Sequence, residues 1–113
     1  FATHTNAAVD IQKGYFRSSG VLGVNSLDRG DFQAPASLSN ADTILNNPVT
    51  DWYWATLDAA ANQFINLTGV TELRLRFQLP DNADRGNDWI RFYSGNYNSS
   101  TSHPMLQVEY YVP

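Results

Sequence analysis

The chain has 113 residues, of which 42% are hydrophobic and 16% are charged, and it contains no cysteine. This length fits one domain with one modest core, and the lack of cysteine excludes disulfides and thiolate metal sites. A net charge of −4 argues against nucleic acid as a partner, since binding phosphates needs clustered lysine and arginine. No apolar run approaches the roughly 20 residues of a membrane-spanning helix, so we expect no membrane insertion.

The first half of the chain predicts one strand and one helical turn. Residues 7–12 have the pattern of a short strand. Residues 31–34 predict a helical turn, with Asp28 or Asp31 as its cap. Residues 37–51 are rich in serine, asparagine, aspartate and proline, and we expect a loop there.

The middle of the chain predicts a strand followed by a short helix. Residues 52–57 are rich in aromatic side chains, which is typical of a strand. Residues 58–65 are the best helix candidate, with Asp58 as the cap, and this helix is too short to be stable without tertiary packing.

The last third of the chain has the clearest pattern. Residues 71–79 alternate strictly between polar and apolar side chains, which predicts a strand of an antiparallel sheet with one dry face and one wet face. A polar loop at residues 80–87 and further strands at about 88–94 and 105–112 follow. We expect the apolar residues of these three strands to form the core: Leu73, Leu75, Phe77, Leu79, Ile90, Phe92, Leu106 and Val108.

Short strands, polar turns and little helix together predict an all-β fold. The expected architecture is a single domain over residues 1–113, an antiparallel β-sandwich or jelly roll with one or two short helical turns. About five strands are predicted, whereas a jelly roll has roughly eight. Either some strands lack a recognisable pattern or the sheets are incomplete.

Several separated segments, which together cover most of the chain, resemble a recurring bacterial module. They are residues 9–16 (VDIQKGYF), 31–34 (DFQA), 52–53 (WY), 65–69 (INLTG), 73–77 (LRLRF), 81–84 (DNAD), 92–95 (FYSG) and 104–111 (PMLQVEYY). The chain thus resembles the DNRLRE-type β-sandwich, a jelly-roll domain related to carbohydrate-binding modules. This resemblance implies a non-catalytic module near the end of a large secreted or cell-surface protein.

Modules of this type usually carry further strands upstream of the segment that resembles residues 7–16. We therefore expect the chain to be the C-terminal half to two-thirds of such a module. This would account for the low number of predicted strands, and it would leave the sheet in need of partner strands.

Three carboxylates in the predicted loop form a candidate calcium site. Asp81, Asp84 and Asp88 lie within eight residues, calcium prefers such oxygen ligands, and jelly-roll modules often hold a structural calcium. The spacing does not match an EF-hand, because Ala83 stands where a third ligand would be required. The alternative is a solvated hairpin loop that uses aspartate and asparagine for its turns.

Two tryptophans form a candidate binding surface. On a strand, Trp52 and Trp54 share one face about 7 Å apart, while Tyr53, Ala55 and Leu57 share the other. If Leu57 points to the core, the two indoles point outwards, where they could stack on pyranose rings or anchor a protein contact. Alternatively, the missing strands or a loop cover both rings. In modules of the DNRLRE type, the position of Trp54 is usually small and polar.

No residues stand out as catalytic, so we do not expect an enzyme. The two histidines, His4 and His103, lie outside any nucleophile motif such as G-x-S-x-G. We expect an extracellular or cell-surface module that binds polysaccharide. The alternative is a structural subunit of an extracellular filament, sheath or matrix, assembled with identical or other chains by strand addition.

Overall fold

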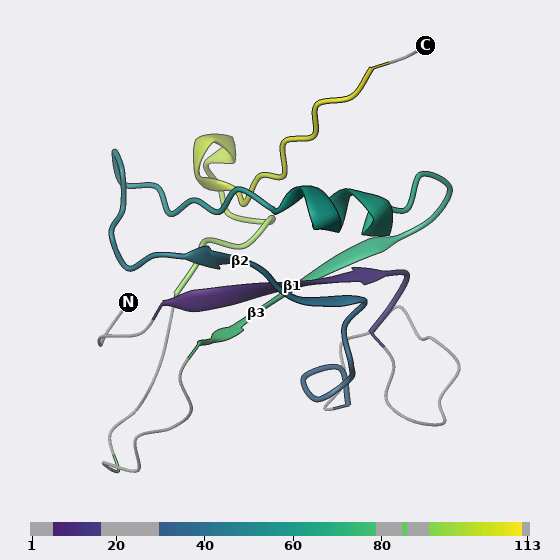
Figure 1. Ribbon diagram of the computed structural model, residues 1–113. Helices are drawn as coiled ribbons and strands as arrows, with labels where there is room; N and C mark the ends of the chain where they lie inside the picture. The colour runs from purple at the N-terminus through teal and green to yellow at the C-terminus, as the bar shows by residue number, and fades with distance from the viewer. Residues whose placement is uncertain (1–5, 17–29, 79–84, 86–90, 112–113) are drawn as a thin grey trace.

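The computed structural model describes residues 6–16, 30–78, 85 and 91–111. Its elements in chain order are β1 (Ala7–Lys13), β2 (Leu38–Ile44), the 3₁₀-helix η1 (Ala59–Phe64), β3 (Thr71–Phe77) and the 3₁₀-helix η2 (Ser100–Ser102). The strands form one antiparallel sheet in the order β2-β1-β3 (Figure 1). The predicted all-β class is therefore confirmed, and the part of the chain that the structure describes contains one sheet.

β1 is the central strand and is buried on both faces, from Ala7 to Ile11. It pairs with β3 over its whole length, with Val9 opposite Leu75 and Ile11 opposite Leu73. Because opposite residues of an antiparallel pair share a face, the two predicted alternations combine into one apolar face and one polar face. The strands predicted at residues 7–12 and 71–79 are confirmed.

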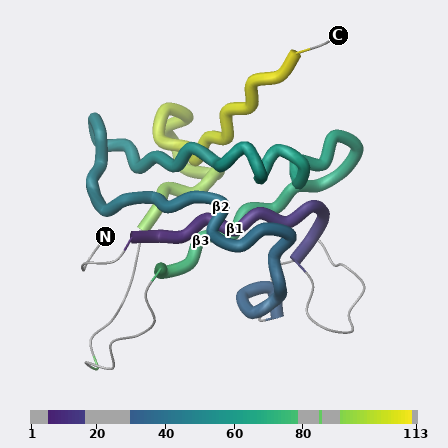
Figure 2. Tube along the Cα trace, viewed as in Figure 1, coloured from purple at the N-terminus to yellow at the C-terminus, as the bar shows by residue number. Residues whose placement is uncertain are grey.

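The chain from residue 53 to residue 65 covers the apolar face of the sheet (Figures 1 and 2). One end of the core contains Ala7, Val9 and Ile44, with Tyr53, Ala55 and Leu57 packed against them. The other end contains Ile11, Ala41 and Ala61, with Leu38, Leu57, Phe64 and Ile65 packed against them. The covering segment therefore stabilises the sheet by removing the apolar side of β1 from water.

The loop predicted at residues 37–51 is wrong over its first part, which forms β2. The register of β2 against β1 shifts between Val9 and Ile11, so β2 contains a β-bulge. Asn40 lies in this bulge with a φ of 54°, a conformation that asparagine tolerates better than most residues. The residues that favour a loop in the sequence are thus used inside a strand whose place is set by tertiary pairing.

The strand predicted at residues 52–57 is also wrong. Thr50 and Asp51 both have positive φ, and backbone hydrogen bonds join Val49 and Trp52 in both directions. This is a tight turn, after which residues 53–58 cross the apolar face without joining the sheet. The predicted cap of the following helix is confirmed, since Asp58 Oδ1 accepts a hydrogen bond from the Ala60 N–H at 3.0 Å.

The helical turn predicted at residues 31–34 lies in a turn that begins at Gly30. The Gly30 carbonyl accepts hydrogen bonds from the Gln33 and Ala34 N–H groups. Residues 91–94 and 105–111, the described parts of the last two predicted strands, are not strands. The described residues also include no helix that is long and apolar enough to cross a membrane.

The predicted core is largely wrong. Phe92, Leu106 and Val108 are exposed, while Leu73 and Leu75 are 41% and 40% exposed. Phe77 is half-buried, and Leu79 and Ile90 lie outside the described residues. The core instead centres on β1, because β1 has a paired strand on each side and β3 lies at an edge of the sheet.

Candidate functional site

Asp10 is the fully buried charged residue at the centre of the polar face. Its Oδ2 accepts hydrogen bonds from Arg74 Nη2 at 2.7 Å and from Arg76 Nε at 3.0 Å. Arg74 lies directly opposite Asp10 in the β1–β3 register, and Arg76 is two residues further along β3. Pairing of the two strands therefore brings one carboxylate between two guanidinium groups, which compensates for burying its charge.

The other oxygen of Asp10 stabilises the bulge of β2. The Asn40 N–H donates to Asp10 Oδ1 at 2.8 Å. Burial alone would raise the pKa of Asp10, but the Asn40 hydrogen bond and the two arginines outweigh it, so the pKa lies below its ordinary value of 3.8. Asp10 therefore stays ionised and links all three strands of the sheet.

Arg74 extends this network to the turn that begins at Gly30. Its Nη1 donates to the backbone carbonyls of Asp31 at 2.8 Å and Ala34 at 2.7 Å. Its guanidinium carbon lies 4.4 Å from the centre of the Phe16 ring, which is a cation–π contact. The predicted wet face is therefore covered around Arg74, whose side chain is only 13% exposed.

Glu72, on the same face of β3, is engaged in a similar way. Its Oε2 accepts a hydrogen bond from the Phe16 N–H at 2.6 Å. Asp10 thus has partners that favour its ionised form, whereas a general acid must hold a proton. The arrangement fastens segments of backbone together, and its chemistry is structural.

Sequence reasoning missed this network, although each half of it has a signal. Asp10 interrupts an apolar strand, and Arg74 and Arg76 share the polar face of another strand. Neither pattern shows that the two strands are neighbours, because 64 residues separate Asp10 from Arg74.

The two tryptophans lie at the start of the segment that covers the apolar face. Tyr53, Ala55 and Leu57 pack against the core, and Trp54 points away from it with 58% of its surface exposed. Trp52 is half-buried. The alternation of sides predicted for this segment is thus present, although the segment is held by packing and by the turn at residues 49–52 rather than by strand pairing.

The indole rings of Trp52 and Trp54 form an aromatic pair, of which Trp54 is the more exposed member. Their centroids lie 6.0 Å apart, and the ring planes are tilted by 44°. The rings therefore form a bent surface rather than a flat one. Such a surface could contact two neighbouring faces of a ligand, and a small aromatic surface next to water is also typical of protein contacts.

The other candidate groups are weaker. An open hollow of about 430 Å³ lies at the end of β1, and Lys13 is the charged residue in its lining. The lining residues are Gln12, Lys13, Gly14, Tyr15 and Pro35. His103 has its Nε2 2.7 Å from the Tyr97 carbonyl oxygen. Both arrangements lack the convergent polar groups that a specific small-molecule site needs.

The three predicted calcium ligands, Asp81, Asp84 and Asp88, lie outside the described residues. His4 lies outside them as well. Among the residues that are described, no group of three or more histidine, aspartate or glutamate side chains could hold a metal ion. Calcium binding by these three aspartates therefore stays a prediction.

The outer edge of β3 is the last candidate site. The Gln78 N–H donates to the Asn6 carbonyl, and the Gly14 N–H donates to the Val70 carbonyl. In this register, the backbone groups of the even-numbered residues of β3 form the hydrogen bonds with β1. The backbone groups of Leu73 and Leu75 consequently point to the opposite edge, because pairing directions alternate along an antiparallel strand. In the described part of the chain, no strand pairs with that edge.

Comparisons with protein-family models, with curated proteins and with solved structures give no match to this chain. The resemblance to the DNRLRE-type module is thus a hypothesis that depends on the quoted segments alone. The features of the chain that bear on function are the tryptophan pair, the Asp10 network and the edge of β3.

Proposed function

We propose that this chain is a non-catalytic module of a secreted or cell-surface protein, and that it binds polysaccharide through Trp52 and Trp54. The observation that carries the proposal is the tilted indole pair, in which Trp54 is 58% exposed and Trp52 is half-buried. Aromatic faces provide a large contact area at little cost in conformational entropy, and they suit the apolar faces of sugar rings.

The backbone that carries the two tryptophans is fixed on both sides of Trp54. The turn at residues 49–52 fixes the start of the segment, and Tyr53, Ala55 and Leu57 anchor it on the sheet. Trp54 is therefore held in place by its neighbours before any ligand arrives, which lowers the entropic cost of binding.

A non-catalytic role agrees with the state of the carboxylates on the polar face. Two arginines and a backbone N–H group bind the carboxylate of Asp10, which does not suit it to donate a proton while these contacts persist, and Glu72 binds the Phe16 N–H. An extracellular location agrees with a surface built from asparagine, serine and threonine rather than from charged residues. The DNRLRE-type resemblance, with its β-sandwich architecture, supports the same proposal.

Binding to polysaccharides tests this function. The folded chain is mixed with insoluble cellulose, chitin and xylan, and the bound fraction is measured as a function of polysaccharide concentration. We expect retention on at least one of them, and at least a tenfold loss of affinity in Trp54→Ala, equivalent to about 1.4 kcal/mol. Phe32→Ala is the matched control, because Phe32 is an exposed aromatic residue on another part of the molecule.

Two results would count against sugar binding. One is the absence of retention on all three polysaccharides, and the other is equal retention of the wild type and Trp54→Ala. In the second case, the chain would bind polysaccharide through another surface.

A second function, assembly into an extracellular filament, sheath or matrix, is favoured by the edge of β3. Leu73 and Leu75 present both apolar side chains and backbone hydrogen-bonding groups there. Such an edge can accept a strand from another chain, since the added strand satisfies the backbone groups and covers the leucines. Light scattering of the purified chain at increasing concentration measures this, and a constant monomer mass would exclude it.

A further inference from the structure

We propose that residues 105–111 of a second copy of this chain add as a partner strand to the outer edge of β3, with which no strand pairs in the described part of the chain. The proposal rests on the second function proposed above, assembly, and it names the segment that carries it. Residues 105–111 are called the donor segment below.

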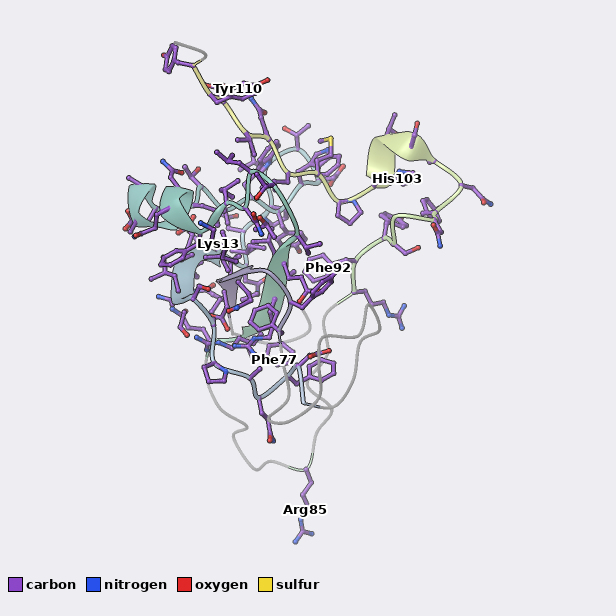
Figure 3. All side chains as sticks on the ribbon, turned by 90° about the vertical axis from the view of Figure 1, so that its right-hand side faces the viewer. Lys13, Phe77, Arg85, Phe92, His103 and Tyr110 are labelled. Atoms are coloured by element: carbon purple, nitrogen blue, oxygen red, sulfur yellow. The ribbon has the colours of Figure 1, made fainter. Side chains whose placement is uncertain are left out.

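The donor segment has the pattern of a strand but no strand partner in the described structure. Leu106, Val108 and Tyr110 alternate with Gln107 and Glu109. All of its residues are exposed, and this part of the chain runs away from the sheet (Figures 1 and 3). An apolar–polar alternation with no buried side favours a segment that is buried only after it has found a sheet edge.

The edge of β3 has the complementary pattern. Leu73 and Leu75 are about two-fifths exposed on one face, and Arg76 is 41% exposed on the other. A strand paired with β3 therefore needs apolar residues on the first face and an acceptor or a negative charge on the second. The donor segment offers both at a spacing of two residues.

Charge and exposure together select one antiparallel register, because a shift of two residues would place Glu109 opposite Arg74, whose side chain is only 13% exposed and already bonded to Asp10. With Tyr110 opposite Leu75, Glu109 lies opposite Arg76, whose Nε already contacts Asp10. A shift of four residues would place Glu109 opposite Glu72, where like charges repel. The chosen register also sets Val108 opposite Phe77, so the apolar side chains of both strands share one face.

The same register satisfies the backbone. Leu75 directs its N–H and C=O to the outer edge, and the residue opposite it in an antiparallel pair can exchange two hydrogen bonds with it. Tyr110 takes this position. The donor segment of a chain runs away from its own sheet, so the partner edge belongs to another copy (Figure 1).

The first test compares two matched substitutions of exposed aliphatic residues. Val108→Asp places a charge in the donor segment, and Leu67→Asp places one at a site that is 90% exposed and outside both strands. Analytical ultracentrifugation over a hundredfold range of concentration should show assembly of the wild type and of Leu67→Asp. Val108→Asp should require at least tenfold more protein to reach the same degree of assembly.

Neither substitution falls in the core, and circular dichroism with a thermal melt confirms that each variant is folded. A wild type that stays monomeric would overturn both the proposed assembly and the proposed role of the donor segment. Assembly of Val108→Asp at the wild-type concentration would overturn the donor segment alone and leave assembly through another surface.

The second test identifies the contact. The chain lacks cysteine, so a tagged Leu75→Cys chain and an untagged Tyr110→Cys chain can be mixed and bridged with a short bismaleimide. We expect bridged dimers that contain one chain of each kind, and none when Leu67→Cys replaces Leu75→Cys. If one chain carrying both cysteines is bridged internally while monomeric, the donor segment fills its own edge and the second copy is not needed.

Discussion

Ile11 on β1 and Leu73 on β3 lie opposite each other on the same face of the sheet, but Ile11 is fully buried and Leu73 is two-fifths exposed. The strand on which each residue lies explains the difference. β1 has a neighbour on each side, and residues 53–65 cover it, whereas β3 pairs with one strand among the residues that the structure describes. The same apolar pattern therefore produces a core in one strand and a partly exposed edge in the next.

The two faces of β3 differ in the same way. On the polar face, Arg74 and Glu72 have partners on β1, on the turn after Gly30 and at Phe16. On the apolar face, the leucines are still partly in contact with water. The polar contacts hold β3 in the sheet, and the described residues leave its leucines partly exposed.

The largest expected loss of stability comes from removing the charge of Asp10. Asp10→Asn should cost about 3–5 kcal/mol of the free energy of unfolding, because it leaves two arginines without their buried counter-charge. Urea unfolding at fixed protein concentration measures the change. Asp58→Asn is the control, since asparagine caps a helix about as well as aspartate. A loss below about 1 kcal/mol in Asp10→Asn would mean that the network does not hold the strands together.

Shortening Ile11 and Leu73 to alanine compares directly how much each side chain contributes to the free energy of unfolding. Ile11→Ala should cost about 2–5 kcal/mol, because it leaves a cavity in the core. Leu73→Ala should cost only about 1 kcal/mol in the monomer, because water can fill the space at the edge. Equal losses at low protein concentration would show that the edge of β3 is already covered.

Acid should weaken the polar side of the sheet. The folded pKa of Asp10 lies below its ordinary value of 3.8, so the unfolded chain binds a proton more readily than the folded chain. The stability that Asp10 contributes is complete above about pH 4, and it is lost as the pH falls through the folded pKa. Urea midpoints between pH 2 and pH 7 should fall at the acid end by more in the wild type than in Asp10→Asn. Parallel curves would remove Asp10 from the explanation of acid sensitivity.

The smallest expected effect concerns the predicted calcium ligands in the sequence after β3. If Asp81, Asp84 and Asp88 bind calcium with the affinity of roughly 0.1–1 mM that is usual for extracellular modules, then 1 mM calcium should stabilise the fold by about 0.4–1.4 kcal/mol. Thermal melts with calcium and with a chelator measure this. Magnesium at the same concentration controls for ionic strength, and superimposable melts would exclude a calcium site that stabilises the native state.

Local patterns in the sequence predicted the elements whose cause is local. The alternation in residues 71–79 and the apolar run of residues 7–12 gave β3 and β1, and Asp58 gave the cap of η1. β2 escaped prediction because Asn40 and its polar neighbours favour a loop unless β1 lies beside them. The predicted core failed because an alternating pattern identifies a face without showing whether another part of the chain covers it.

The candidate sites differ in the same respect. The outward direction of Trp54 follows from the position of Leu57, three residues further on, so the sequence was enough to predict it. The partnership of Asp10 with Arg74 and Arg76 depends on pairing between distant strands, so the sequence shows a signal for each half but not that the two halves meet.

The order of the strands along the chain also determines when the fold can form. β1 is the central strand of the sheet, yet the ribosome makes it before both of its neighbours. Arg74 follows Asp10 by 64 residues, which corresponds to roughly 3–13 s at a synthesis rate of about 5–20 residues per second. During this interval, Val9 and Ile11 have no neighbouring strand on the β3 side. A nascent chain of this kind therefore depends on late, long-range contacts, and we expect slow folding that benefits from a holding chaperone.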